Sequence, residues 1–431
     1  MSGKHILTYR PYRLLWYADT ASQLGIALYY IANVFMVYRL TGQAAMVGYN
    51  GALEALPFFI FGPYSGVVAD RFDRRKVMLV AGLFSGTCLL ALGVITWMYR
   101  GVTPVAAILV TSFLSCTGRA FFYPARNASV PRLVPTNRAM DANIWSAVSQ
   151  NFVFSAGQAL SATLIAGLYV VSREYFYLAA VLVNGASYFV SVFFVARLPQ
   201  IIPEAETAPQ RAFTDVKAGF GYIRKRKDLV VLLWVIVVAN FMIAPFFPCY
   251  VKANSLWFDG RPQSLAWIEF SFFVPTIFTG LALMRWKMRH MGWGNIIGWS
   301  GIGFAVAAMS FIRTVKGWCA LNASCGLVGP LAWIPTDTYL QVTVPDEFRG
   351  RVQSARTMLS AGIQPIGLAL GGVLIDSLGL PAVLQIMGWG MVAAGVVGVC
   401  SHAFRNAITP DDAEFPGPPL TGFDLPIEAE A

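Results

Sequence analysis

Three ionisable residues interrupt apolar runs that are otherwise long enough to cross a lipid bilayer. They are Asp19, Glu54 and Arg119. A charged side chain at the centre of a hydrocarbon core costs at least about 2.5–3.5 kcal/mol on insertion scales, so such residues are candidates for substrate or ion pathways. We expect Asp19 and Arg119 to lie at one depth and to form an ion pair that substrate or a proton disrupts. A structural pair that only locks helix packing is the alternative.

Glu54 is the first candidate for a proton carrier. It falls near the middle of its apolar run, where removal from water favours the neutral carboxylic acid over the carboxylate. A carboxyl that stays neutral and hydrogen-bonded across helices is an equally open interpretation. Glu269 falls nearer the end of its run and is expected to be interfacial. No histidine lies deep in a run, so a histidine relay is not expected.

The composition places most of the chain in a membrane. Of its 431 residues, 56% are hydrophobic and 13% are charged, and the mean hydropathy is +0.58. A soluble domain carries about 25% charged residues, so this chain cannot cover a water-facing surface of its size. The net charge of +10 comes from Lys and Arg in short loops between apolar runs. That pattern is typical of topogenic signals, and nucleic-acid binding is not expected.

The apolar runs predict an all-α membrane protein with about twelve transmembrane helices in two six-helix halves. The runs are 13–38, 44–68, 77–99, 104–124, 141–168, 175–197, 229–251, 263–284, 292–312, 316–341, 352–377 and 381–403. A proline-rich and basic break separates six runs from six. The expected parts are an N-terminal half at 1–198, a linker at 199–228, a C-terminal half at 229–404 and a disordered tail at 405–431.

Lys and Arg also predict the orientation of the chain. They crowd the loops on the side of the linker and of both termini, whereas the opposite loops carry few of them. Because positively charged loops stay in the cytoplasm, we expect the linker and both termini to be cytoplasmic. An even number of spans agrees with this orientation.

Short motifs recur in register in the two halves. Val130–Pro135 after the fourth run matches Gln341–Pro345 after the tenth, and Ser155–Gly157 in the fifth matches Ser360–Gly362 in the eleventh. Such repeats predict duplicated halves, and transporters built in this way carry their substrate between the halves near the membrane midplane.

A charged turn between the second and third runs resembles the loop signature of the major facilitator superfamily. It comprises Gly66, Asp70, Arg71, Arg74 and Arg75. A worn copy follows the eighth run, with Met284 at the position of Asp70. The resemblance implies two six-helix halves that work by alternating access. It also implies that Asp70 accepts hydrogen bonds at the start of the eleventh span, near Val352, because a helix N-terminus favours negative charge.

Two further pairs are expected to take part in gating. Arg71 and Arg75 are positioned to pair with Asp141 at the head of the fifth span, for which an N-cap role is an equal alternative. Asp337 and Arg356 fall at similar depths in the tenth and eleventh spans, where they would form a second latch in the C-terminal half.

Other motifs resemble exporters of the enterobactin and macrolide type. They include Phe121–Arg126 and Val344–Val352. The resemblance implies a bacterial-type inner membrane protein that exports an organic molecule, driven by protons. One departure concerns the fifth span, where antiporters usually carry Gly-Pro: this chain has Gly157-Gln158, and the proline appears instead as Pro365.

These features predict a secondary active transporter for proton-coupled export of an amphipathic organic compound or a siderophore-like molecule. Its expected partners are a small-molecule substrate, membrane lipid and protons. An importer or lipid flippase of the same fold, or a non-transporting membrane scaffold or assembly factor, is the alternative. The sequence has no ATP-binding loop and no recognisable nucleophile–base set. Neither an ATP-driven pump nor an enzyme is therefore expected, and no cofactor or metal site is predicted.

Overall fold

The computed structural model describes residues 6–99, 103–171, 175–202, 212–258, 260, 262–286 and 290–407. The helices of the N-terminal part are α1 (Arg10–Thr41), α2 (Ala44–Arg71), α3 (Arg74–Met98), α4 (Val105–Ser129), α5 (Ala139–Val171) and α6 (Phe176–Val195). Short 3-10 turns lie at Ile6–Thr8, Val130–Arg132 and Thr136–Arg138. Residues 203–211 of the predicted linker, and nearly all of the predicted disordered tail, lie outside the described residues.

The C-terminal part is also built from successive helices. They are α7 (Ala212–Lys225), α8 (Lys227–Ile243), α9 (Phe246–Trp257), α10 (Pro262–Trp286), α11 (Met291–Met309), α12 (Val315–Thr343), α13 (Asp346–Leu378), α14 (Leu380–Cys400) and α15 (His402–Arg405). Helices α8 and α9 cover the predicted seventh run. That run is broken at Pro245, which has no N–H to continue the hydrogen-bond ladder.

Ten segments within the described ranges are long and apolar enough to cross a membrane. They include α8 and α9 taken together, but neither α5 nor α11. The helical architecture confirms the predicted all-α membrane fold, whereas the number of twelve spans stays a prediction, as do the domain boundaries.

Local sequence explains where several helices begin and end. Gly42 adopts a left-handed conformation with φ of 66° and ends α1, a geometry that is cheap only for glycine. Asp73 caps α3, because its side chain accepts a hydrogen bond from the Arg75 N–H. The α2–α3 turn is therefore only two residues long, and it fixes the position of the charged motif at that end of the bundle.

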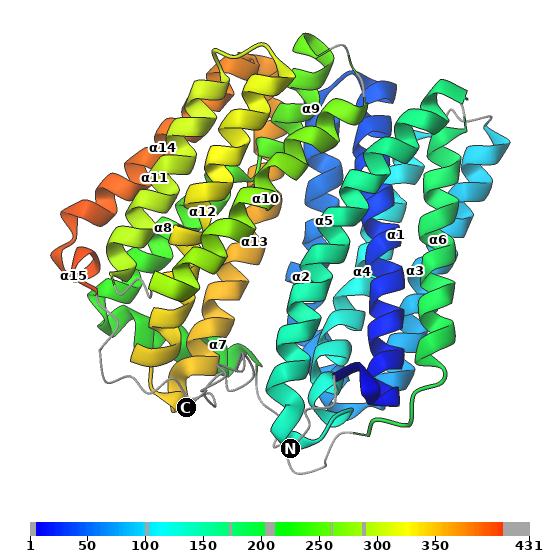
Figure 1. Ribbon diagram of the computed structural model, residues 1–431, viewed down its shortest axis with the longest axis horizontal. Coiled ribbons are helices and arrows are strands. Elements are labelled where there is room, and N and C mark those ends of the chain that lie inside the picture. The colour runs from blue at the N-terminus through cyan, green and yellow to red at the C-terminus, as the bar shows by residue number, and fades with distance from the viewer. Residues whose placement is uncertain are drawn as a thin grey trace, which may run out of the picture.

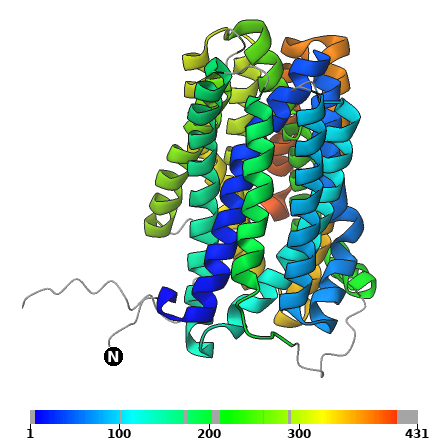
Figure 2. The ribbon, with the colours of Figure 1, turned by 90° about the vertical axis from the view of Figure 1, so that its right-hand side faces the viewer.

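The helices form two bundles that lie side by side. Helices α1–α6 occupy the right of Figure 1 and α8–α15 the left. Within the first bundle α1 packs against α6 and α5, and α4 packs against α2 and α3; Figure 2 shows α1 and α6 next to each other along their length. Within the second bundle α11 packs against α12 and α14. Two pairs of antiparallel helices, α2 with α13 and α5 with α10, pack against each other where the bundles meet.

The α2–α13 contact is close because glycine lines both sides of it. A Cβ atom on Gly372 would lie 2.6 Å from the Ala44 carbonyl oxygen, and one on Gly48 would lie 2.3 Å from the Leu368 carbonyl oxygen. These residues lie where α2 begins and α13 ends, which we call the Asp376 end. At the other end, the Asp70 end, the ribbons of the two bundles diverge, at the bottom of Figure 1.

We expect Gly372→Ala to destabilise the protein, because its added methyl group would meet backbone atoms of α2. Overpacking of this kind costs about 1–3 kcal/mol, so the thermal unfolding midpoint should fall by a few degrees. Gly62→Ala is the matched control: no atom lies within 4 Å of its Cβ position, and alanine favours the helix. Equal midpoints for the two variants would contradict the close α2–α13 contact.

Candidate functional site

Asp19 of α1 is paired with Arg126 of α4. Arg126 Nη2 donates to Asp19 Oδ2 at 2.9 Å, and Gln150 Nε2 of α5 donates to the same oxygen at 2.8 Å. Asp19 and Arg126 are only 2% and 5% exposed. The predicted Asp19–Arg119 pair is therefore wrong. The predicted fourth run stopped at Pro124, whereas α4 continues through this proline to Ser129 and keeps Arg126 on its inner face.

The Asp19 site is incompletely satisfied. Within the described residues, Asp19 Oδ1 and Arg126 Nε are buried and have no hydrogen-bond partner. A buried polar atom without a hydrogen bond is costly, particularly next to a buried charge. A water molecule or a ligand group could therefore bind here by accepting from Arg126 Nε or by donating to Asp19 Oδ1.

Glu54 of α2 is the centre of a polar network inside the N-terminal bundle. Its Oε1 accepts from Asn33 Nδ2 of α1 at 3.1 Å and from Asn50 Nδ2 at 2.9 Å. The Tyr177 hydroxyl of α6 donates to Asn33 Oδ1 at 2.9 Å, and the Ser112 hydroxyl of α4 donates to Asn50 Oδ1 at 2.8 Å. The network therefore joins four helices through one carboxyl group. Asparagine is uncharged, so ionisable residues inside the apolar runs point to Glu54 but not to Asn33 or Asn50.

Arg119 lies on the same small cavity as Glu54. The cavity has a volume of about 20 Å³, which is room for about one water molecule. The Arg119 guanidinium lies 5.9 Å from the ring centroid of Phe58 and 5.7 Å from that of Tyr123. Among the described residues no carboxylate is within 4.0 Å of it, and its Nε has no hydrogen-bond partner. Arg119 is thus held by aromatic rings rather than by an ion pair.

Tyr123 links the Arg119 cavity to the Asp19 site. Its hydroxyl lies 3.4 Å from Arg119 Nη2 and 3.3 Å from Gln23 Nε2. Gln23 is one helical turn from Asp19 on α1. Polar groups therefore follow one another along α1 and α4 between the two sites.

Glu269 of α10 faces the contact between the bundles. Its carboxyl group interacts with the Tyr250 hydroxyl of α9. Tyr250 packs edge-on against Phe247 at 4.8 Å, and Phe247 packs against Tyr30 of α1 at 4.6 Å between centroids. Tyr30 also lines the Glu54 cavity. The expectation of an interfacial Glu269 came from its position along the run, which does not reveal the inward face of α10.

The charged turn after α2 makes its hydrogen bonds and ion pairs within its own bundle, in the part of the chain that the structure describes. Asp70 is exposed and pairs with Arg74 at 3.7 Å, while Arg74 also donates to the carbonyl oxygens of Ala69 and Ala128. No described hydrogen bond joins Asp70 to α13. Gly66 has no atom within 4 Å of its Cβ position, so the close approach of another element does not require a glycine there.

Arg75 and Asp141 have separate partners. Arg75 Nη2 donates to the Ala196 carbonyl oxygen, and Asp141 pairs with Arg138 at 3.1 Å. Arg71 is exposed. The structure therefore does not form the predicted pairing of Arg71 and Arg75 with Asp141.

The C-terminal bundle has two charged clusters near the Asp70 end. Arg356 of α13 pairs with Asp337 of α12, as predicted, although the gating role of this contact stays a prediction. Arg226 donates to both carboxylate oxygens of Asp228 at 2.9 and 2.6 Å, and the Tyr339 hydroxyl of α12 donates to Asp228 at 2.6 Å. This second cluster links α8 to α12.

Asp376 makes a polar contact between the bundles that the sequence did not reveal. At the end of α13, its Oδ2 accepts from the Ala45 N–H in the first turn of α2, at 2.8 Å. Its Oδ1 lies 3.1 Å from Lys252 Nζ of α9. An acidic group at a helix N-terminus is stabilised by the free N–H groups and the helix dipole. This is the type of contact predicted for Asp70, but made at the opposite end and in the opposite direction.

Comparisons with known proteins indicate a family. The family profile described as transmembrane secretion effector matches residues 5–421. Macrolide efflux protein A of Streptococcus pyogenes is 25% identical over 372 residues, which are 85% of this chain and 89% of the relative. The multidrug efflux pump Tap of Mycobacterium tuberculosis is 23% identical over 420 residues, which are 92% and 94% of the two chains.

Solved structures agree on the fold. The nucleoside transporter NupG superposes with a TM-score of 0.66 at 15% identity and covers 90% of this chain and 98% of its own. A bacterial homologue of the human lysosomal transporter Spinster, in an inward-facing and unoccupied conformation, superposes with a TM-score of 0.65 at 14% identity. It covers 94% of this chain and 97% of its own. At these identities the likeness concerns the fold alone.

We expect Arg126→Met to lower the thermal unfolding midpoint far more than Arg119→Met. The first change leaves the buried Asp19 carboxylate without its cation, which typically costs about 3–5 kcal/mol. The second removes aromatic contacts and long hydrogen bonds to Tyr123 and Cys116, but no ion pair among the described residues. The double variant with Asp19→Leu should recover part of the loss. A greater loss for Arg119→Met would show that the pairing seen here is not the one that stabilises the bundle.

Proposed function

Because the chain belongs to the transmembrane secretion effector family of the major facilitator superfamily, we propose that it exports an amphipathic organic compound in exchange for protons. It is a multi-pass membrane transporter and not an enzyme. Efflux pumps for macrolides and for multiple drugs among its relatives support the direction of transport. The excess of Lys and Arg on the linker side supports cytoplasmic termini in a bacterial inner membrane.

The observation that carries this proposal is the cavity shared by Glu54 and Arg119. Its volume of about 20 Å³ admits a water molecule or a proton but not an organic substrate. Glu54 therefore carries the proton, and the substrate binds elsewhere, between the bundles. A deprotonated Glu54 attracts the unpaired Arg119 across the cavity, and a protonated one releases it.

Tyr30 connects the proton site with the surface between the bundles. It lines the Glu54 cavity on one side and packs against Phe247 of the C-terminal bundle on the other. A shift of Arg119 toward Glu54 changes the shape of this cavity and hence the position of the Tyr30 ring. Proton uptake is coupled in this way to the contact of Tyr30 with Phe247, which lies between the two bundles.

Two acidic residues on one antiparallel helix pair provide the switch for alternating access. Asp376 of α13 holds the first turn of α2 in this conformation, while Asp70 of α2 is exposed. Each helix begins where the other ends. The free N–H groups at the start of α13 are therefore available to Asp70 in the way that those at the start of α2 are available to Asp376. We assign the present state as closed at the Asp376 end. In the opposite state Asp376 is released and Asp70 binds the N-terminus of α13.

The transport proposal is tested by accumulation assays in cells that lack their own efflux pumps. Cells expressing the chain should accumulate less radiolabelled erythromycin or less ethidium, and a protonophore should remove the difference. Glu54→Gln should remove protonophore-sensitive efflux, because the amide cannot take up and release the coupling proton. Glu54→Asp keeps the carboxyl group and should retain part of the activity.

Three results would contradict this assignment. Wild-type efflux by Glu54→Gln at equal expression would exclude Glu54 as the carrier, and wild-type rates in both Arg119→Ala and Asp19→Asn would remove the other polar groups from the path. Accumulation that rises on expression would indicate an importer instead.

The switch is tested by distances between spin labels. Labels at Gln43 and Ser377, both exposed at the Asp376 end, report the separation of α2 and α13 there once the six native cysteines are replaced. Asp376→Asn should increase the population with long distances, because α2 loses its charged acceptor. Asp70→Asn should decrease it. Lys316→Gln, exposed at the same end, is the control. Unchanged distributions in both acidic variants would rule out the switch.

A further inference from the structure

A second cavity lies on the outer side of the N-terminal bundle, where α2 and α3 separate over α4. Its volume is about 570 Å³, within the range of sites for small organic ligands. Thr117, Gly118 and Phe121 of α4 form its floor, and it shares no lining residue with the Glu54 cavity. We call this cavity the α2–α4 groove. It has no part in the transport path proposed above.

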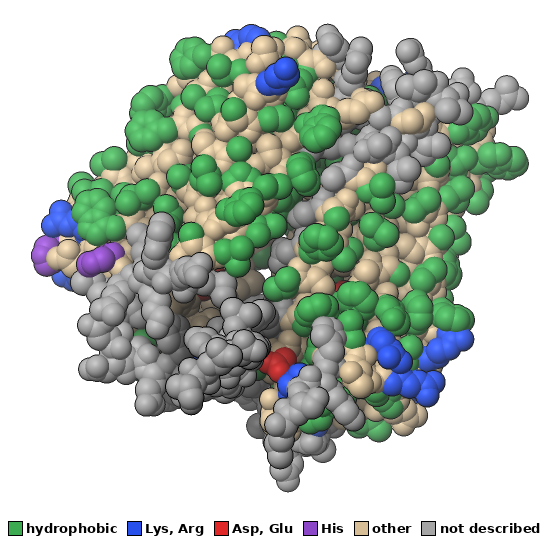
Figure 3. Space-filling view, in the orientation of Figure 1, with side chains coloured by type: hydrophobic (Ala, Val, Ile, Leu, Met, Phe, Trp, Pro, Cys, Tyr) green, Lys and Arg blue, Asp and Glu red, His purple; other side chains and the backbone are tan. Residues whose placement is uncertain are grey.

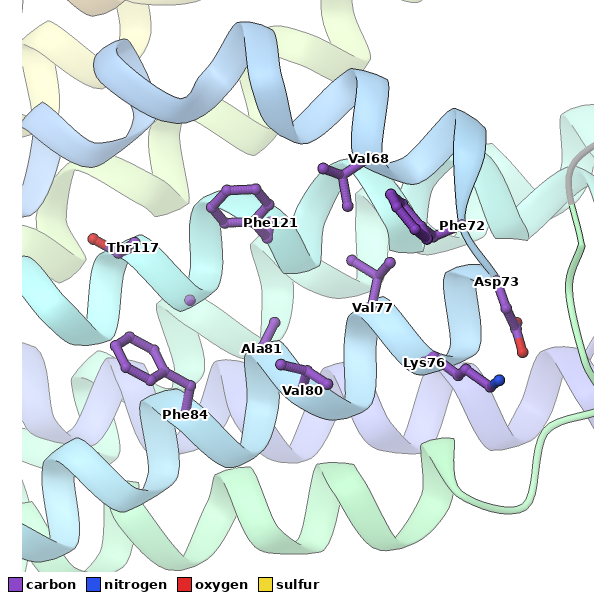
Figure 4. Close-up of a pocket in the computed structure, with 11 residues that line it drawn as sticks. Val68, Phe72, Asp73, Lys76, Val77, Val80, Ala81, Phe84, Thr117 and Phe121 are labelled. Carbon is purple, nitrogen blue, oxygen red and sulfur yellow. The ribbon is translucent and has the colours of Figure 1, made fainter.

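The α2–α4 groove is apolar along its length and charged at one end. Figure 4 shows Asp73 and Lys76 at one end and Phe84 at the other, with valine and phenylalanine side chains between them. Lys76 and Phe84 are eight residues apart on α3, a distance of about 12 Å along the helix. Phe72 and Val80, which line the groove, are 60% and 68% exposed. In a membrane these side chains face lipid, so the occupant has an extended hydrocarbon part.

The charged end of the groove favours an anion. The Asp73 carboxylate is already engaged, because its Oδ1 accepts from the N–H groups of Arg75 at 3.0 Å and Ile201 at 3.1 Å. Lys76 is exposed, and among the described residues no carboxylate lies within ion-pair distance of its ammonium group. Figure 3 shows Lys and Arg side chains gathered at the lower right of the molecule, on the N-terminal bundle.

We propose that the α2–α4 groove binds one anionic phospholipid, with an acyl chain between α2 and α3 and the phosphate beside Lys76. A groove that ends in an unpaired ammonium group at the start of a membrane helix matches an amphiphile with a negative head. The lipid contacts Phe72 and Asp73, the two residues that join α2 to α3. It therefore supports the two-residue turn that follows α2, close to Asp70.

Native mass spectrometry of the full chain tests the site. The protein is released from micelles that contain equal amounts of phosphatidylglycerol and phosphatidylcholine, and the retained lipids are counted. Wild-type protein should retain one phosphatidylglycerol in preference. Lys76→Gln should lower that preference roughly fivefold, the effect of one basic residue at an anionic surface. Lys76→Arg should preserve it.

Matched variants separate the groove from the general charge of the protein. Lys225→Gln, exposed on α7 at the same end, should not alter the preference. Val80→Trp narrows the groove and should weaken retention of phosphatidylglycerol, whereas Leu83→Trp, exposed on α3 but outside the lining, should not. Thermal unfolding in the absence of added lipid checks that all variants are folded.

Several outcomes would overturn the proposal. An unchanged preference in Lys76→Gln, or an equal loss in Lys225→Gln, would assign the selectivity to overall charge. Displacement of the lipid by inorganic phosphate alone would identify a free-anion site. Displacement by erythromycin would identify the groove as a site for the exported compound. None of these results depends on Glu54, so they are distinguishable from a failure of the transport proposal.

Discussion

The contact between α2 and α13 is the constraint on which the arrangement of the two bundles depends. The backbones can touch only because Gly48 and Gly372 have no side chains at the point of contact. The close approach brings the free N–H groups at the start of α2 within reach of the Asp376 carboxylate. The same contact positions Asp70, at the far end of α2, away from α13. A single antiparallel helix pair thus holds the two bundles in close contact at the Asp376 end.

Two sets of charged groups differ in how tightly they are paired. Near the Asp70 end each bundle has a cluster that ties its first membrane helix to its fourth: Asp19 with Arg126 in one, and Asp228 with Tyr339 in the other. The correspondence extends the sequence repeat to the level of side-chain chemistry, although the residues differ. Deeper in the N-terminal bundle, Glu54 and Arg119 share a cavity without touching. The first set is paired within each bundle, whereas Glu54 and Arg119 form no ion pair in the part of the chain that the structure describes.

Hydrophobic runs predicted the helices well, because length and apolarity are local properties of the sequence. They could not predict which charged residues meet. The apolar run ends at Pro124 and so predicts a loop at Arg126. A proline in a membrane helix is tolerated where neighbouring helices pack around it, and α4 continues to Ser129. Asp376 lies in the last turn of α13, and its position in the sequence does not mark it as a contact residue. Its significance comes from Ala45 on a helix more than 300 residues away.

The donors around each buried acid decide which of them can exchange a proton. Protonation of Asp19 would remove its charge attraction to Arg126, whose guanidinium donates to Asp19 Oδ2 together with the amide of Gln150. Around Glu54 the donors are the amides of Asn33 and Asn50, which can bond to a carboxylate or to the carbonyl oxygen of a carboxylic acid. The network around Glu54 therefore survives protonation, whereas the Asp19 pair does not. This difference supports the proposal that Glu54, rather than Asp19, carries the coupling proton.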